Sequence, residues 1–493
     1  MSLLLLMRTS TQGLQSAFDD VWGWWRADTY TGSSPTITLQ DRSGNARHMV
    51  QAAGTLTPGT ATNGQARMVG GGSTTRLDCA ATLDAWPMTS ITVAKHTNNI
   101  QMGFFGFSGT LPANRCWYGI ESTNNYYLLN TNGAFQSNAA NAGSTTVYGA
   151  RTGYGSRVGI INGVLISDDN CPSIVRPAAE GVSIGTQYRG LNGEWQETLT
   201  WNRLLSLAEL DEVHSYLNSR YGLTIPLWSG YSSARTILFL GQSNMSGRGD
   251  RGASDVNIPA EYDAALTGVN VFYGTPSGNI GTSWDTLNIN TPNHMLCDQA
   301  QQNSFIGPIV TAGKEYIDRT GGSVYCMSTA QGSTSLEYDA ALNYWDPTDN
   351  TIAHQNTRRM FYLTGRNWWK AARIHQAAGR RPDLMGVAWL QGEQDATVLA
   401  YANAYQANLE AFAPLLDAEL GCPYRKFVLC RIHNSITETY KDTVRGAQDN
   451  AALNIRDCTL VNLDGYGLRD TVHLNVAAVL DLGNVIQNLL PGN

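Results

Sequence analysis

A serine, a histidine and an aspartate stand in short segments of this chain whose residue types suit nucleophilic catalysis. Ser243 lies in the segment GQSNM at 241–245, directly after the apolar run 236–240. A serine on a turn between a strand and a helix can expose its hydroxyl and direct its own backbone N–H toward an oxyanion. An ordinary Ser/Asn turn would contain the same residues, so this segment by itself leaves both interpretations open.

The segment DTVH at 470–473 places Asp470 three residues before His473. Both side chains can then lie on one side of a single turn, where the carboxylate orients the imidazole and the imidazole reaches a serine elsewhere in the fold. A pair with this spacing is also common by chance. An aspartate that caps the following helix would account for Asp470 equally well.

A third segment, QGEQD at 391–395, follows the apolar run 385–390. Gly392 permits an unusual backbone conformation, and Gln391 offers amide donors. A loop before a helix would explain the acidic residues Glu393 and Asp395, because negative charge suits a helix N-terminus. This segment therefore indicates a site only in combination with the other two.

The elements that must position these residues alternate between strand and helix patterns from Thr236 onward. This alternation predicts an α/β domain with a parallel sheet that is flanked by helices on both faces. Catalytic residues in such sheets lie on loops at the carboxyl ends of strands, so we expect the three segments at one edge. The predicted strands are 236–240, 323–329, 385–390, 426–431 and 459–463, and the predicted helices are 356–378, 396–419, 440–454 and 475–489.

The first half of the chain has a different pattern, in which short apolar or alternating runs are separated by Gly, Asn and Ser. Asn162-Gly163 between two such runs is a strong hairpin signal, because both residues accept positive φ. Many short strands with turns between them predict a β-sandwich. One helix closes this part, with a capping box at Ser206 and Glu209 and a stop at Gly222.

We therefore expect two domains, a β-sandwich over 16–228 and an α/β domain over 235–493, joined by the linker 225–230. The length of 493 residues supports more than one domain. The net charge of -7 and the absence of a basic stretch exclude a nucleic-acid footprint. A neutral glycan partner is compatible with this charge but is not indicated by it.

The N-terminal run 3–7 is shorter than the apolar core of a secretory signal and has no basic residue before it. We expect neither a signal peptide nor a membrane span, although action outside the cell, for example in a phage particle, stays compatible. The eight cysteines form no CxxC and no cysteine–histidine cluster with zinc spacing. Free, buried thiols and no metal site are the expectation, and the redox compartment stays open.

The order GQSNM, QGEQD and DTVH resembles the SGNH hydrolases, and specifically their sialate O-acetylesterase and carbohydrate-acetylesterase branch. That branch carries GQSNM in its first block, QGExD or QGExN in its third and DxxH in its last, and the resemblance covers about 235–493. It implies that Ser243 is the nucleophile, His473 the general base and Asp470 its orienting partner. It also implies an acetylated glycan as substrate and no cofactor.

The same resemblance implies an oxyanion hole formed by Ser243, Gly332 and Gln391. Gly332 comes from the second block, which reads AQGSTS at 330–335. Many relatives have two glycines before the Ser/Thr of this block, and this chain has one, so the oxyanion donor is less well defined than the three catalytic residues. In this branch the third-block amide, here Gln391, replaces the asparagine of other SGNH enzymes. Glu393 is expected to support the pocket.

The N-terminal half resembles concanavalin A-like, laminin-G-type jelly rolls. This resemblance rests on 24–28 (WWRAD), on 41–45 (DRSGN) and on the closing strand and helix at 193–222. Domains of this type often bind glycans, and many only assist assembly or spacing.

Three other functions are alternatives to a serine esterase that removes O-acetyl groups from a carbohydrate. A non-catalytic glycan-binding or adhesion protein, including a receptor-binding component of a phage tail, would not require Ser243, Asp470 and His473. A general short-chain esterase or a lipase shares the chemistry, but no long apolar lid segment lies near Ser243. Glu194 and Glu197 could suggest a retaining glycosidase, yet this spacing on a regular strand puts them on opposite faces. The sugar, the acetylated position and the oligomeric state stay open.

Overall fold

The computed structural model describes residues 16–491, with the exception of 62, 73, 84–86, 97–101, 108–116, 121–125, 131–132, 138–142, 154–155, 168–179, 186–189, 251–257, 274–282, 291–304, 340 and 348–358. Three cysteines, Cys116, Cys171 and Cys297, lie outside the described residues. The other five are free, and Cys79, Cys326 and Cys430 are buried, as expected for them.

The N-terminal part is a single antiparallel sheet of sixteen strands that folds over itself into two facing layers. Contacts between strands that are not neighbours in the sheet show the layering: Phe104 stacks on Tyr148 with ring centroids 4.2 Å apart, and the Tyr118 hydroxyl contacts Ser90 and Thr92. The prediction of a β-rich, sandwich-like N-terminal domain is therefore confirmed. Its strands are β1 (Gly23–Thr31), β2 (Thr38–Asp41), β3 (Met49–Ala53), β4 (Leu56–Thr60), β5 (Ala66–Gly71), β6 (Arg76–Leu83), β7 (Met88–Lys95), β8 (Met102–Phe107), β9 (Trp117–Ile120), β10 (Tyr126–Asn130), β11 (Gly133–Ser137), β12 (Thr146–Thr152), β13 (Arg157–Ile161), β14 (Val164–Ser167), β15 (Glu180–Ile184) and β16 (Asn192–Trp201).

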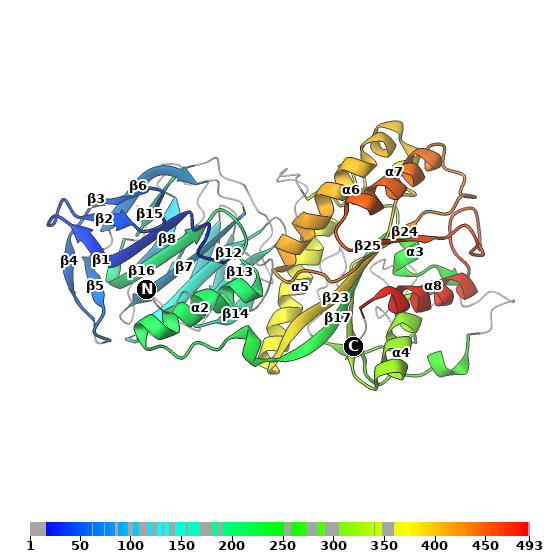
Figure 1. The fold of residues 1–493 in the computed structure, drawn as a ribbon, viewed down its shortest axis with the longest axis horizontal. Coiled ribbons are helices and arrows are strands. Elements are labelled where there is room, and N and C mark those ends of the chain that lie inside the picture. The colour runs from blue at the N-terminus through cyan, green and yellow to red at the C-terminus, as the bar shows by residue number, and fades with distance from the viewer. Residues whose placement is uncertain are drawn as a thin grey trace.

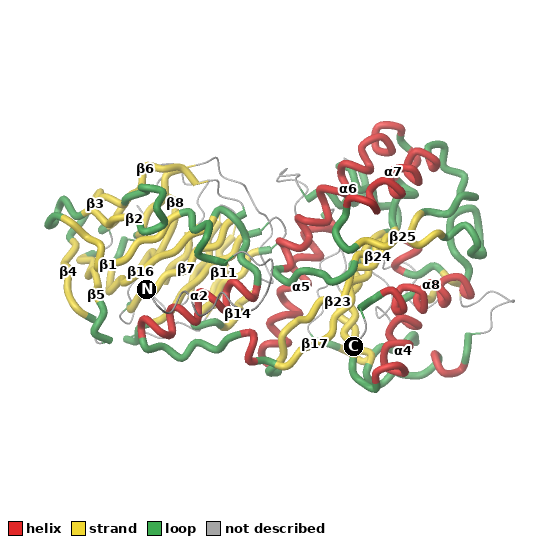
Figure 2. Tube along the Cα trace, viewed as in Figure 1, coloured by secondary structure: helices red, strands yellow, loops and turns green. Residues whose placement is uncertain are grey.

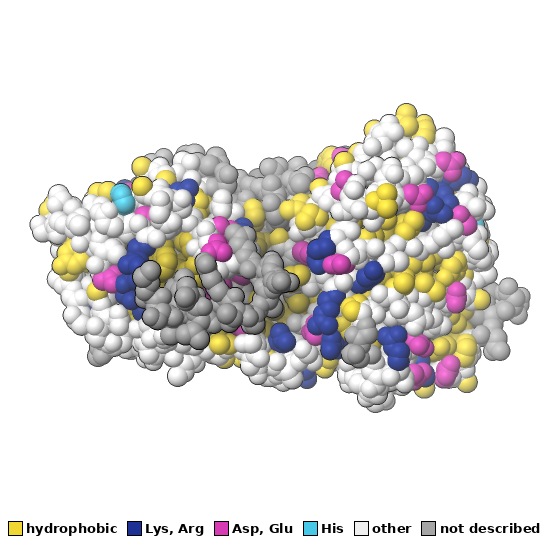
Figure 3. All heavy atoms as spheres, viewed as in Figure 1, with side chains coloured by type: hydrophobic (Ala, Val, Ile, Leu, Met, Phe, Trp, Pro, Cys, Tyr) yellow, Lys and Arg dark blue, Asp and Glu magenta, His cyan; other side chains and the backbone are white. Residues whose placement is uncertain are grey.

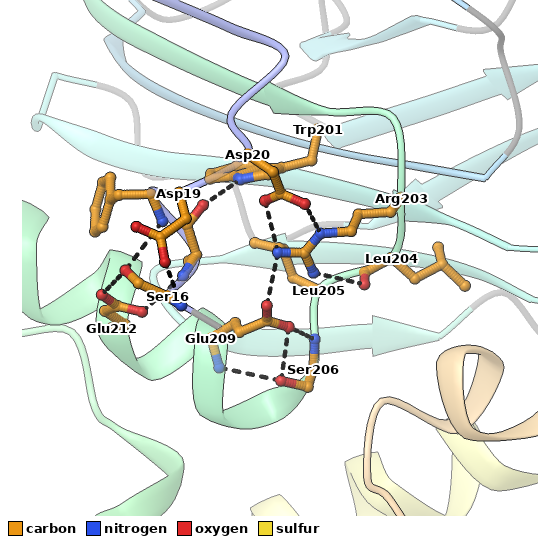
Figure 4. A network of polar contacts seen from close by, with 12 residues as sticks. Ser16, Asp19, Asp20, Trp201, Arg203, Leu204, Leu205, Ser206, Glu209 and Glu212 are labelled. Carbon is orange, nitrogen blue, oxygen red and sulfur yellow. Dashed lines mark hydrogen bonds and ion pairs between the residues drawn. The ribbon is translucent and has the colours of Figure 1, made fainter. Parts of the chain in front are cut away.

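The helix α2 (Leu207–Tyr221) lies along the outside of this sheet (Figure 1). The predicted capping box is present, since the Ser206 side chain accepts from the Glu209 backbone and the Glu209 side chain accepts from the Ser206 backbone. Figure 4 shows how Arg203 joins this cap to the segment before β1. Its guanidinium pairs with Asp20 of that segment and with Glu209 of the cap. The helix ends at Gly222 in the left-handed conformation, as the sequence predicts.

The C-terminal part is a seven-stranded sheet with the order β20-β19-β22-β17-β23-β24-β25. All its pairs are parallel except β19 with β20. Its strands are β17 (Ser232–Gly241), β19 (Val269–Tyr273), β20 (Asp285–Thr286), β22 (Val324–Ser328), β23 (Arg380–Leu390), β24 (Phe427–Arg431) and β25 (Cys458–Asn462), and a separate two-stranded sheet contains β18 (Gly249–Asp250) and β21 (Phe305–Ile306).

The prediction of a purely parallel sheet was therefore incomplete, because this sheet is mixed. β20 is an antiparallel edge strand of two residues that contains no apolar run, so the sequence pattern did not reveal it. The stretch 274–284 between β19 and β20 is also shorter than the crossover of a dozen or more residues that a parallel pair needs. β19 itself and the helix α4 (Ile309–Thr320) were missed as well.

Helices cover both faces of this sheet (Figure 2). Side chains of β17 alternate between the two faces: Leu238 and Leu240 pack in one apolar cluster with α5, α6 and α7, whereas Ile237 and Phe239 pack in another with α4 and α8. The two-sided burial accounts for the continuous apolar run of β17. The helices are α3 (Ser243–Ser246), α5 (Met360–Ala377), α6 (Leu399–Leu420), α7 (Lys441–Asn454) and α8 (Val476–Leu489), with short 3-10 turns η2 (Trp228–Gly230), η3 (Ala260–Tyr262) and η6 (Asp395–Thr397).

The two parts share a buried interface along α5 and the end of α6 (Figure 1). The Gln376 amide of α5 donates to the Gly163 carbonyl at 2.7 Å and accepts from the Leu165 N–H at 2.8 Å, so it binds the predicted hairpin β13–β14. Arg151 of β12 donates to the Ala418 carbonyl and lies over the Trp369 ring. The N-terminal sheet is thus packed against the helical layer of the C-terminal domain.

On the face drawn in Figure 3, Lys and Arg side chains lie in small groups, many of them beside Asp or Glu.

None of the helices in the described part of the chain combines the length and the apolar character that a membrane crossing requires.

Candidate active site

The turn after β17 presents Ser243 at the carboxyl edge of the sheet. Gly241 ends the strand at a φ of +138°, where a Cβ would lie 2.0 Å from the Leu390 carbonyl oxygen of β23. The Gln242 N–H then donates to that same carbonyl at 2.9 Å, and α3 begins at Ser243. Glycine is thus required at 241 for both the backbone conformation and the close approach of the two strands.

The structure brings Ser243, His473 and Asp470 together in a chain of hydrogen bonds. His473 Nε2 lies 3.1 Å from Ser243 Oγ, and its Nδ1 lies 2.9 Å from Asp470 Oδ2. Nδ1 therefore donates to the carboxylate, which leaves Nε2 as the acceptor that faces the serine hydroxyl. Ser243 comes from the turn after β17, and Asp470 and His473 come from the loop before α8, so two of the three segments meet here.

Asp470 is held as a carboxylate by donors from its own loop. The backbone N–H groups of His473 and Val472 donate to Oδ1 at 2.7 and 2.9 Å, and Arg469 Nη2 donates to Oδ2 at 2.9 Å. Partial burial alone would raise the pKa of Asp470, but these donors and the His473 side chain hold it well below its usual range. A charged partner for the imidazole is therefore present at any moderately acidic or neutral pH.

Two backbone N–H groups near the serine have no acceptor among the described residues, those of Ser243 and Gly332. The loop that contains Gly332 is held beside the nucleophile turn, because the neighbouring Gln331 N–H donates to the Gly241 carbonyl at 3.0 Å. Unpaired N–H groups beside a serine hydroxyl can stabilise a developing oxyanion.

Gln391 lies in the same region, but its amide hydrogens already have acceptors. Its Nε2 donates to the Thr334 carbonyl at 2.7 Å and to the Asp395 carboxylate. Gln391 therefore holds the Gly332 loop in this structure and has no N–H left for a bound oxyanion.

The Asp395 carboxylate also binds the loop that contains Gly332. It accepts the Leu336 N–H at 3.0 Å and the Glu337 N–H at 3.4 Å, in addition to Gln391. Burial raises the pKa of Asp395 to about 7, although these donors oppose the rise. In the sequence, the only signal for Asp395 was its position in QGEQD. Because an acidic residue at a helix N-terminus explains that position as well, the contact with the Gly332 loop was not predicted.

Glu393, which the sequence resemblance gave as a residue that supports the pocket, is buried beside Asn244. Its Oε1 accepts from Asn244 Nδ2 at 2.7 Å, and its Oε2 has no partner among the described residues. Burial, together with the nearby carboxylates of Glu438 and Asp395, raises the pKa of Glu393 to about 7. Asn244 was not selected from the sequence, where its position next to Ser243 was the only signal.

The glycosidase alternative finds no support in Glu194 and Glu197. A bulge between Trp195 and Glu197 interrupts the regular alternation on which the opposite-face argument relied. Glu194 pairs with Arg67 and Lys95, whereas Glu197 is fully buried and accepts from Trp24, Tyr216 and Tyr221. Both carboxylates are thus engaged by structural partners.

The model of the family of carbohydrate esterases described as sialic acid-specific acetylesterases matches residues 233–490, more than half of the chain. The chain belongs to this family. The family match contains every residue of the Ser243 site and stops short of the sixteen-stranded sheet, which ends at Trp201. The resemblance seen in the sequence is therefore confirmed for the C-terminal part.

Three solved structures show a limited similarity to this chain. A protein from Arabidopsis thaliana is 20% identical over 52% of this chain and 96% of its own, with a TM-score of 0.39. A carbohydrate acetylesterase from Xanthomonas citri is 14% identical over 84% of this chain and 70% of its own, with a TM-score of 0.36. NanS is 13% identical over 52% of this chain and 97% of its own, with a TM-score of 0.39. The search of curated proteins found no match to this chain.

Proposed function

We propose that this carbohydrate esterase removes O-acetyl groups from a sugar or polysaccharide through an acetyl-serine intermediate, with O-acetylated sialic acid as the first substrate to test. The observation that carries the proposal is the hydrogen-bond chain from Ser243 Oγ through His473 to Asp470. The family match supports an acetyl ester of a carbohydrate as the substrate class.

In the acylation step, Ser243 Oγ bonds to the acetyl carbonyl carbon while its proton passes to His473 Nε2. The carbonyl oxygen becomes an oxyanion, which the N–H groups of Ser243 and Gly332 stabilise. Loss of one such donor typically costs about 3 kcal/mol of transition-state stabilisation. When the tetrahedral intermediate collapses, His473 returns the proton to the sugar oxygen, and the sugar leaves as an alcohol.

In the deacylation step, a water molecule attacks the acetyl-serine while His473 takes its proton. The second tetrahedral intermediate collapses to acetate and free Ser243, which recovers its proton from His473. Gln391 supports this oxyanion hole through its bond to the Thr334 carbonyl. A direct bond from Gln391 to the oxyanion would require it to release Thr334 or Asp395.

We propose a division of labour between 16–228 and 235–493, in which the esterase reaction belongs to the second domain. The sandwich-like first domain would bind the glycan or set the spacing of a larger assembly. Binding of an acetylated polysaccharide to an inactive Ser243→Ala protein would measure recognition separately from hydrolysis.

The test of the proposed function is acetate release by the full chain from O-acetylated sialic acid, from an acetylated neutral polysaccharide and from a long-chain ester. We expect release from an acetylated sugar, and Ser243→Ala should lower it by several orders of magnitude. The exposed Ser229→Ala is the matched control and should keep wild-type turnover.

The outcomes separate the alternatives. Faster turnover of the long-chain ester than of any acetyl ester would identify a general esterase or lipase. Glycan binding without acetate release, unchanged in Ser243→Ala, would identify a binding or adhesion protein.

A further inference from the structure

The side chain of Asn244 joins the nucleophile turn to both peptide groups that flank His473. Its Oδ1 accepts the Leu474 N–H at 3.0 Å, and its Nδ2 donates to the Val472 carbonyl at 3.2 Å. Asn244 is 3% exposed, so water does not compete for these contacts. One amide therefore spans the residue after Ser243 and the residues on either side of His473.

The bonds of Asp470 do not provide this link. Asp470 accepts from Arg469, Val472 and His473, all of which belong to its own loop. It orients the imidazole relative to that loop but does not fix the loop relative to Ser243. Within the described residues, the hydrogen bonds that join 241–246 to 466–475 are those of Asn244, apart from the Ser243–His473 bond itself.

Glu393 determines which way the Asn244 amide faces. The Leu474 N–H requires an oxygen, whereas the Val472 carbonyl and Glu393 Oε1 require an NH₂ group. A flipped amide would place its oxygen against two acceptors and its NH₂ against a donor. The buried Glu393 carboxyl thus selects the one orientation in which Asn244 holds the histidine loop.

We propose that Asn244 and Glu393 are a positioning pair that keeps His473 within hydrogen-bond distance of Ser243. This inference rests on the proposed function, because the step that the pair controls is attack by Ser243 on the acetyl ester. Neither residue contacts the reacting atoms. A displacement of about 1 Å in such a site can lower the rate by about 10²-fold.

The burial of Glu393 is consistent with this role. Leaving one carboxyl oxygen without a partner in the interior is unfavourable, so a structural account of Glu393 needs a contact that outweighs this cost. Among the described residues, the side chain that hydrogen-bonds to Glu393 is that of Asn244. The other titratable groups that face it, Glu438 and Asp395, are both acidic and repel its charged form.

The experiment compares Asn244→Leu, Asn244→Asp, Glu393→Leu and Glu393→Gln in the full chain. The readouts are kcat and KM on 4-nitrophenyl acetate and the rate at which a fluorophosphonate labels Ser243. Asn244→Leu and Glu393→Leu should lower kcat and the labelling rate by about 10²-fold with little change in KM. Glu393→Gln should keep much more of both rates than Glu393→Leu, because a glutamine oxygen can still accept from Asn244.

Melting temperatures and circular dichroism distinguish lost positioning from lost folding, and the exposed Asn450→Leu is the control for the asparagine change. If Asn244→Leu does not fold, the isosteric Asn244→Asp and the comparison of Glu393→Gln with Glu393→Leu still test the proposal. Wild-type kcat and labelling in a folded Asn244→Leu or Glu393→Leu protein would overturn the proposal, as would equal losses in Glu393→Gln and Glu393→Leu.

Failure of the proposed function gives a different result. A wild-type protein that hydrolyses no acetyl ester would refute the esterase assignment, while fluorophosphonate labelling would still report whether Asn244 and Glu393 position His473. Normal hydrolysis that depends on Ser243 but not on Asn244 or Glu393 would refute only the positioning pair.

Discussion

The carboxyl groups around the site have opposite electrostatic environments. Asp470 lies on an exposed loop and receives donors from two backbone N–H groups and from Arg469, which hold its pKa well below its usual range. Glu393 is buried near the carboxylates of Glu438 and Asp395, and burial raises its pKa to about 7 although its own backbone N–H and Asn244 donate to it. Asp470 therefore stays charged at neutral pH, whereas Glu393 titrates near neutral pH.

This difference predicts a pH-dependent effect of Glu393→Gln on stability. An unfolded glutamate loses its proton near 4.5 and the folded Glu393 near 7, so the group favours the folded state at acid pH. That contribution is lost as the pH rises from about 4.5 through 7. Relative to wild type, the free energy of unfolding of Glu393→Gln should increase by about 1–3 kcal/mol between pH 5 and pH 8.

Urea unfolding at the two pH values measures this difference. Glu410→Gln is the control, because Glu410 is only partly buried and its neighbours Asn454 and Gln406 lower its pKa. A constant difference between wild type and Glu393→Gln at pH 5 and pH 8 would show that Glu393 is not held protonated in the folded protein.

At the scale of elements, the site is made by loops that meet at the carboxyl edge of adjacent strands. β17 lies between β22 and β23, so the Ser243 turn, the Gly332 loop and the Gln391 loop follow neighbouring strands. The Gln242 side chain links the first and third of these loops, since its Oε1 accepts the Gly392 N–H at 3.3 Å. The close approach of Gly241 to β23 allows this contact.

Gly241→Ala should therefore damage both stability and catalysis. The new Cβ would meet the Leu390 backbone oxygen, and the positive φ is unfavourable for alanine. We expect a loss of at least about 2 kcal/mol in the free energy of unfolding and a marked fall in kcat. Gly446→Ala in α7, where a Cβ meets nothing within 4 Å, should instead be neutral or slightly stabilising. Equal melting temperatures and kcat values for Gly241→Ala and wild type would contradict this account of the turn.

At the scale of the whole molecule, the two parts are joined by a buried interface that contains charged residues. Arg151 is fully buried, donates to the Leu205 and Ala418 carbonyls and lies 4.4 Å from the Trp369 ring centroid. Burial lowers the pKa of Arg151 to about 10, against the opposing charge of Glu419 and Glu209. Glu419 is also fully buried, at the end of α6. The N-terminal sheet is consequently part of the environment that stabilises the esterase domain.

Arg151→Met should destabilise the whole chain, because it removes the hydrogen bonds to the Leu205 and Ala418 carbonyls and the charge that offsets that of Glu419. A hydrogen bond from a charged donor contributes about 1.5–3 kcal/mol, and adding Glu419→Gln, which removes the opposing charge, should recover part of the loss. Urea unfolding of the full chain measures both. Arg425→Met provides the control, because the Arg425 side chain is exposed and its partner Asp383 also pairs with Arg235, so this change should cost no more than about 1 kcal/mol. An Arg151→Met cost as small as that of Arg425→Met would show that the interface does not depend on this charge.

Local patterns in the sequence determined five strands and four helices of the C-terminal domain and the three residues of the hydrogen-bond chain. β17, β22, β23, β24 and β25, the Asn162-Gly163 hairpin and the Ser206 capping box lie where the sequence predicts them, because each depends on residues close together in the chain. Ser243, Asp470 and His473 could be selected because their motifs occur in the family's order. The edge strand β20 escaped, since two residues carry no periodicity.

Only the tertiary structure decided how the remaining side chains are paired. Asn244 and Leu474, Gln391 and Thr334, and Arg151 and Ala418 are distant in sequence, and the order of the strands determines that they meet. A motif shows that an amide is present at 391 or 244, but its orientation depends on which donors and acceptors the other loops bring to it. For this reason the sequence indicated Gln391 as an oxyanion donor, while the folded chain directs its amide to Thr334 and Asp395 and uses Asn244 to join the serine and histidine loops.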